Sequence, residues 1–99
     1  MSRYELSQKA DQDLVNIYSY SLQSFGERQA DKYLQDISLC LRDLAKHPLK
    51  GREAKDIEDG IYKFNFVSHM IFYVIQPSGI FVARILHKSM DHPHHLEVL

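Results

Sequence analysis

The chain has 99 residues, of which 44% are hydrophobic and 11% aromatic, and its formal net charge is −1. A chain of this length forms one domain, and this composition supplies an apolar core without the help of disulfides or a metal. The near-neutral charge argues against a protein that holds nucleic acid through its phosphates, because such domains are usually strongly basic.

Targeting signals and cysteine content both favour the cytoplasm. The N-terminus, MSRYELSQKADQDL, has no apolar segment like that of a signal peptide. No apolar run approaches the roughly 18 residues that span a membrane. Cys40 is the single cysteine and cannot form an internal disulfide, which fits a reducing compartment. We therefore expect a cytoplasmic protein that does not associate with membranes.

The first third of the chain predicts a strand and a helix. Residues 3–7 alternate polar and apolar side chains, which indicates a short strand, and Ser7 is placed to cap the helix that follows. From Gln8 to Phe25 apolar residues recur every three or four positions, which predicts an amphipathic helix that stops at Gly26. Its solvent face is expected to carry Lys9, Asp11, Gln12, Asp13 and Asn16.

The same spacing predicts a second helix from Glu27 to about Lys46. Glu27 and Lys46 complement the helix dipole at its two ends, and Pro48 prevents its continuation. The connection between the two helices is so short that they must form an antiparallel helical hairpin. Cys40 lies beside the apolar stripe of the second helix, where we expect a small core residue.

The rest of the chain predicts a loop and three strands. Residues 47–60 are polar and of mixed charge, which favours a solvated loop over a basic substrate-binding loop. Apolar runs rich in β-branched and aromatic residues then predict strands at Ile61–Phe66, Met70–Ile75 and Ile80–Leu86. Short turns join them into an antiparallel meander.

The predicted fold is a single α+β domain over residues 1–99, in the order strand, helix, helix, strand, strand, strand. Strand 61–66 alternates strictly, with Tyr62, Phe64 and Phe66 on one side. We expect that face to pack on the helical hairpin. The opposite face is expected to stay partly open, with Lys63 and Arg84 as its candidate cations.

Catalytic and metal-binding motifs are weak. The chain has no GxSxG motif and no glycine-rich phosphate loop. His87, His92, His94 and His95 gather near the C-terminus, but Pro93 interrupts them and no cysteine joins them, which favours a solvated or partner-facing tail over a metal site. Lys63, Arg84 and His87 could form an acid–base nuclease set. We favour surface or partner contacts for them and assign no catalytic residue.

Short motifs extend over nearly the whole chain. They include Tyr4-x-Leu6-Ser7, Phe25-Gly26, Leu44-Ala45-x-x-Pro48, Gly60-x-Tyr62 and His69-x-Ile71-Phe72-Tyr73. The most specific is Arg84-Ile85-Leu86-His87-x-x-Met90-Asp91-x-x-x-His95-Leu96. With the order of elements, these motifs resemble the RelE/ParE superfamily of bacterial type II toxins, and most closely its ParE branch.

The resemblance implies a protein partner, with no cofactor and no small-molecule substrate. ParE-like toxins are encoded beside a labile antitoxin, expected here to be ParD-like, whose C-terminal segment wraps the toxin. Many of them trap DNA gyrase on cleaved DNA and stop replication, in systems that maintain plasmids or chromosomes. RelE-like relatives instead cut mRNA on the ribosome with Lys, Arg and Tyr or Glu side chains on the open sheet face.

This chain has few such side chains and is not basic. We therefore expect a non-enzymatic gyrase inhibitor. A ribosome-dependent mRNA endonuclease is the alternative, and a toxin-like fold that only binds its antitoxin is a third possibility.

The candidate target-binding residues lie at or after the last strand: Arg84, His87, Met90, Asp91 and His95. Other roles for some of them stay open. Arg84 and Asp91 could form an internal ion pair that ties the tail to the sheet. Met90 and Leu96 could anchor the tail in the core, and Val98 and Leu99 could dock the terminus on the body.

Overall fold

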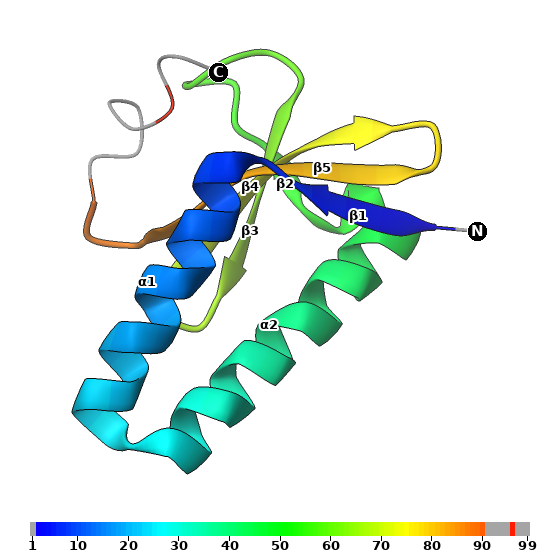
Figure 1. Ribbon diagram of the computed structural model, residues 1–99. Coiled ribbons are helices and arrows are strands. Elements are labelled where there is room, and N and C mark those ends of the chain that lie inside the picture. The colour runs from blue at the N-terminus through cyan, green and yellow to red at the C-terminus, as the bar shows by residue number, and fades with distance from the viewer. Residues whose placement is uncertain (1, 91–95, 97–99) are drawn as a thin grey trace.

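A helical hairpin packs against one face of a five-stranded sheet (Figure 1). The structure, a computed structural model, describes residues 2–90 and 96. Its elements are β1 (Arg3–Leu6), α1 (Gln8–Phe25), α2 (Glu27–Lys46), the 3-10 turn η1 (Pro48–Lys50), β2 (Arg52–Glu53), β3 (Ile61–Phe66), β4 (His69–Gln76) and β5 (Gly79–His87). The predicted order of strand, two helices and three strands is confirmed.

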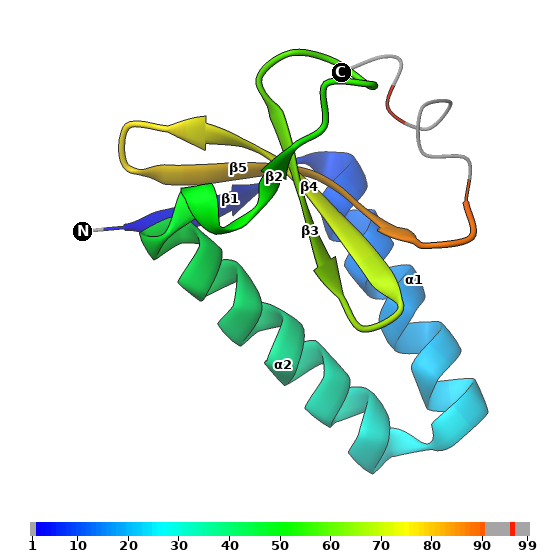
Figure 2. The same ribbon diagram turned by 180° about the vertical axis from the view of Figure 1, so that it is seen from behind.

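Local sequence sets both ends of α1. The Ser7 Oγ accepts a hydrogen bond from the Ala10 N–H at 2.9 Å and caps the helix. Gly26 has a φ of 92°, a conformation that glycine adopts without steric cost, and it joins α1 directly to α2. The predicted cap and stop are therefore confirmed. The joined end of the hairpin extends past the sheet on the side of the β3–β4 turn (Figure 2).

The sheet is mixed, in the order β1-β5-β4-β3-β2. Strands β3, β4 and β5 pair antiparallel, as the meander predicted, whereas β1 pairs in parallel with the outer edge of β5. Parallel partners need a crossover connection, and here the path from β1 to β5 passes through the helical hairpin first. A bulge sets Phe72 opposite Arg84 and Tyr73 opposite Val82.

Apolar clusters lie on both faces of the sheet. The main core lies under the helices, and Tyr62, Phe64 and Phe66 pack against it as predicted. A second cluster contains Ala54, Ile61, Phe72, Leu86 and Leu96. These strand residues alternate with main-core residues, so the second cluster lies on the opposite face. The face that was expected to be partly open is thus covered in part, and Leu96 does anchor the tail there.

The connection 47–60 is not simply a solvated loop, so that prediction was wrong in part. Arg52 and Glu53 pair with β3, and Ala54 is fully buried. The Tyr73 hydroxyl donates to the Pro48 carbonyl oxygen at 2.6 Å and accepts from the Gly51 N–H at 3.2 Å. One buried tyrosine therefore holds the start of the segment, which a polar composition could not reveal.

Two expectations drawn from composition can also be compared with the structure. Cys40 is half-buried and packs against the main core, as predicted, and burial raises the pKa of its thiol. Within residues 2–90 and 96, neither helix is apolar enough over a sufficient length to cross a membrane.

Candidate functional site

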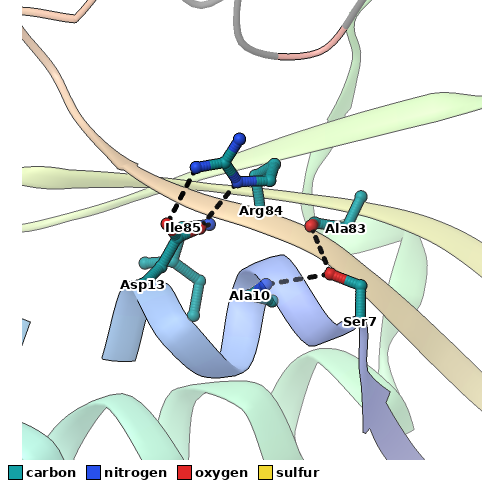
Figure 3. Close-up of polar contacts among 6 residues, drawn as sticks. All are labelled: Ser7, Ala10, Asp13, Ala83, Arg84 and Ile85. Atoms are coloured by element: carbon teal, nitrogen blue, oxygen red, sulfur yellow. Dashed lines mark hydrogen bonds and ion pairs between the residues drawn. The ribbon is translucent and has the colours of Figure 1, made fainter. Parts of the chain in front are cut away.

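The inner edge of β5 pairs with β4 over the whole strand, but the outer edge of its second half is bonded to side chains at the start of α1. The pairing with β1 ends at Val82. Beyond it, the Ser7 Oγ–H donates to the Ala83 carbonyl oxygen at 2.6 Å, and an oxygen of Asp13 accepts from the Ile85 N–H at 2.9 Å (Figure 3). The start of α1 thus replaces the missing strand along this edge.

Arg84 adds an ion pair to this contact. Its Nε and Nη2 atoms each donate to a different oxygen of Asp13 at 2.9 Å. The side chains of Arg84 and Asp13 are only 13% and 10% exposed, so water screens the pair little. The hydrogen bonds from Arg84 to Asp13 raise the pKa of the guanidinium.

One expectation about these residues needs correction. Asp13 was assigned to the solvent face of α1, and this is wrong, because it is buried beside Arg84. The helical period could not reveal a partner 71 residues away. The ion pair that the sequence suggested between Arg84 and Asp91 stays a prediction. Asp91 and His95 lie outside the described residues, as do His92, His94, Val98 and Leu99.

A groove of about 700 Å³ opens beside this edge. Both helices, the β3–β4 turn and the end of β5 line it. Exposed apolar side chains stand around it: Tyr20, Phe25, Val67 and Met90. The rings of Tyr20 and Phe25 meet edge to face, with centroids 6.5 Å apart. Exposed apolar side chains gathered around a hollow are typical of a protein-binding surface.

Two of the groove residues were among the sequence candidates. His87 lies at the exposed end of β5. Met90 is 38% exposed, so it does not anchor the tail in the core as one of the two interpretations held.

A polar cluster of two half-buried residues and one exposed residue lies in the same groove. His69 and His87 are register partners on β4 and β5, with ring centroids 5.4 Å apart. The Tyr33 hydroxyl oxygen lies 2.7 Å from the Nδ1 of His69, and we assign the phenol O–H, the more acidic group, as the donor to this nitrogen. Burial, and then His87, lower the pKa of His69. We therefore assign its neutral form, with the proton on Nε2.

The hydrogen bonds of His87 favour the same tautomer. Its Nδ1 accepts from the Ser89 N–H at 3.1 Å and lies 2.8 Å from the Ser89 Oγ. In the neutral imidazole the proton is then on Nε2. A metal ion needs a deprotonated imidazole nitrogen, and residues 2–90 and 96 hold no group of three or more potential metal ligands.

Sequence reasoning missed most of the groove. Tyr20, Phe25 and Tyr33 have the spacing of ordinary helix residues, and His69 looked like part of a turn. Val67 is the exception that carried a signal. It has a φ of 53° in a two-residue turn, where glycine or asparagine is usual, and a β-branched residue is strained there.

The structure does not bring Lys63, Arg84 and His87 together. Lys63 and Arg84 lie in one cross-strand row but are separated by Phe72 of β4. His87 is three residues beyond Arg84 on the same strand, so its Cβ points to the opposite face of the sheet. The set considered for nuclease chemistry is therefore split between two faces.

Comparisons with known proteins agree on one family. The profile described as "ParE toxin of type II toxin-antitoxin system, parDE" matches residues 4–92. The chain is 32% identical over 96 residues to Toxin ParE1 of Caulobacter vibrioides, which covers 97% of this chain and 99% of that protein. It is 35% identical over 91 residues to Toxin ParE1 of Mycobacterium tuberculosis, which covers 91% and 93%.

A solved structure shows the same fold. It is that of the chromosomal ParDE TA system from P. aeruginosa, and one of its chains superposes with a TM-score of 0.75 at 21% identity, covering 88% of this chain and 96% of that one. Because the family profile spans most of the sequence and the curated relatives match nearly end to end, the chain belongs to the ParE toxin family of type II toxin–antitoxin systems.

Proposed function

We propose that this toxin acts without enzymatic activity of its own, by binding DNA gyrase and trapping it on cleaved DNA. We further propose that a ParD-like antitoxin neutralises it. Membership of a type II toxin–antitoxin family already implies an antitoxin partner. The proposal adds the class of that antitoxin, the target and the mode of inhibition.

The ion pair between Arg84 and Asp13 is the observation that carries the non-enzymatic proposal. Acid–base cleavage of RNA needs a cation that stabilises the charge developing on the phosphate. The guanidinium of Arg84 is instead bound to both oxygens of a nearly buried carboxylate. With His87 on the other face, inhibition through a binding surface is the better supported mode of action.

The groove supports an antitoxin segment as the neutralising partner. An amphipathic helix presents apolar side chains at spacings of three and four residues, which suits a groove with an apolar rim. His87 and Met90 line this groove and are also candidate target contacts. An antitoxin segment bound here would cover both of them, which gives a direct mechanism of neutralisation.

A supercoiling assay tests the gyrase proposal. Purified toxin is incubated with DNA gyrase, ATP and relaxed plasmid, and the products are examined after detergent treatment. We expect inhibited supercoiling and accumulated linear plasmid. Addition of the antitoxin encoded beside the toxin gene should restore supercoiling. Normal supercoiling in the presence of folded toxin would refute the proposal.

The alternative is a RelE-like mRNA endonuclease on the ribosome. Its structural support is the cross-strand row of Arg52, Lys63 and Arg84, which gathers cations on one sheet face. Under this alternative, cleaved mRNA would accumulate on translating ribosomes, and Lys63→Ala or Arg84→Ala toxin would leave the message intact. Under the gyrase proposal no message is cleaved by any of these proteins.

A further inference from the structure

We propose that His69 is a specificity-determining contact in the groove, whose Nε2–H donates to an acidic side chain of the antitoxin, so that docking of the antitoxin takes up a proton. This inference rests on the proposed antitoxin partner. It adds the chemistry by which the groove recognises its occupant and a dependence of recognition on pH.

The first step is the orientation of the imidazole. The Tyr33 hydroxyl and the Nδ1 of His69 share a hydrogen bond, with 2.7 Å between the hydroxyl oxygen and Nδ1. The Tyr33 and His69 rings also pack together, with centroids 5.7 Å apart. These contacts hold the ring in place and make Nε2 the donating nitrogen.

The second step is the charge around the ring. The titratable groups that face His69 are Tyr33 from α2, His87 from β5 and Asp13 from α1, which is paired with Arg84 of β5. Among the described residues, Asp13 supplies the only carboxylate of the groove, and its oxygens already bind Arg84 and the Ile85 N–H. Within the described part of the chain, the groove thus places the His69 imidazole where no further carboxylate is available to it.

The third step identifies the occupant. The rim is apolar, with Tyr20, Phe25, Val67 and Met90 exposed, whereas His69 supplies a hydrogen-bond donor between these side chains. Complementarity therefore favours an amphipathic segment that carries one Asp or Glu among apolar side chains. A purely apolar segment would cover the Nε2–H of His69 without accepting its proton, which disfavours such a segment.

The final step links binding to pH. Burial and the neighbouring His87 keep the pKa of His69 below its usual value in the free toxin, so the ring is neutral at pH 7. A carboxylate placed at Nε2 favours the charged imidazolium and raises that pKa. The complex therefore holds more protons than its separate components, and the affinity should increase as the pH falls from 8 towards 6.

Calorimetry of antitoxin binding tests the inference. The toxin is titrated at pH 7 with the antitoxin encoded beside its gene, in two buffers that differ in ionisation enthalpy. The difference between the two binding enthalpies gives the number of protons taken up. We expect net uptake with wild-type toxin and loss of that uptake with His69→Gln, which keeps an amide donor but cannot titrate. His69→Leu, which has no donor, should bind at least about tenfold more weakly.

His47→Gln is the matched control, because His47 is exposed at the end of α2 and does not line the groove. It should keep both the affinity and the proton uptake of wild-type toxin. Thermal unfolding checks that each variant is folded. Binding without proton uptake by wild-type toxin, or equal uptake by His69→Gln, would overturn the role of His69 and leave the antitoxin proposal standing. Absence of binding by wild-type toxin would refute both.

Discussion

The two halves of β5 are held in place by different means. From Gly79 to Val82 the outer edge is paired with the backbone of β1. From Ala83 onwards it is bonded to the side chains of Ser7 and Asp13. Backbone pairing tolerates many side chains, whereas the second arrangement depends on two residues and a nearly buried charge.

Only one of the two halves lines the groove. Both contribute core residues, but the half bonded to α1 also contributes Ile85, Leu86 and His87 to the groove lining. Side-chain bonds also occupy an edge that would otherwise invite a foreign strand. The start of α1 therefore both protects the edge and fixes the position of one groove wall.

Replacement of Asp13 should have the largest effect, because Asp13 accepts two hydrogen bonds from Arg84 and one from the Ile85 N–H. Asp13→Ala removes this carboxylate from beside the Arg84 guanidinium, in a site that is only 10–13% exposed. We expect a loss of about 3–5 kcal/mol in the free energy of unfolding, measured by urea denaturation. Asp56→Ala is the control, because Asp56 is exposed in the segment 47–60.

A double-mutant cycle sharpens this prediction. Removing Arg84 together with Asp13 also removes the guanidinium that lost its carboxylate, so Asp13→Ala/Arg84→Ala should be less destabilised than the sum of the two single variants. Additive losses would mean that the pair contributes no specific coupling. The Asp13–Arg84 pair would then not distinguish the outer edge of the second half from that of the first.

Ser7 lies where the two halves meet and should have the next largest effect. Its hydroxyl caps α1 and donates to Ala83, so Ser7→Ala loses two bonds. We expect a loss of about 1–2 kcal/mol in the free energy of unfolding. Ser24→Ala, at an exposed position of α1, should change it little. In Ser7→Ala, amide hydrogen exchange should accelerate more in residues 83–87 than in residues 79–82, relative to wild type. Equal acceleration of both halves would contradict the proposed boundary.

The sequence predicted β5 as one strand over residues 80–86, but it did not predict the contacts at the outer edge of either half. Runs of apolar residues define strands and helices, so the helix ends and the three C-terminal strands could be located. Asp13 has the same appearance as a solvent-facing helix residue, and only the folded chain brings Arg84 to it. A two-residue strand such as β2 is too short to leave a pattern. The groove joins four separate segments, and no local signal reports that they meet.

Val67 tests the groove from the side of the β3–β4 turn. Its positive φ is strained, so Val67→Asn, which tolerates this conformation, should raise the free energy of unfolding by about 0.5–1 kcal/mol. Val67 is also 62% exposed on the rim, so the same variant should bind the antitoxin more weakly in a titration. Leu39→Asn, exposed on α2 away from the groove, should leave binding unchanged. If Val67→Asn is stabilised and binds the antitoxin as well as wild type does, the antitoxin-binding rim of the groove does not extend to the β3–β4 turn.

The smallest effect concerns His69, which packs against His87 at the end of the second half of β5. Its pKa is lower in the folded toxin than its ordinary value of 6.5, because of burial and then because of His87. Below about pH 6.5 the unfolded chain therefore binds more protons than the folded one, so the free energy of unfolding falls as the pH falls, until the folded-state pKa is passed. His69→Gln should lack this dependence. Carboxylates titrate in both proteins, so the difference between the two pH profiles isolates the contribution of His69. His47→Gln should keep the wild-type profile. Parallel pH profiles for wild-type and His69→Gln toxin would mean that the imidazole is equally easy to protonate in both states, and the end of β5 would then have no proton-sensitive contact for an antitoxin to use.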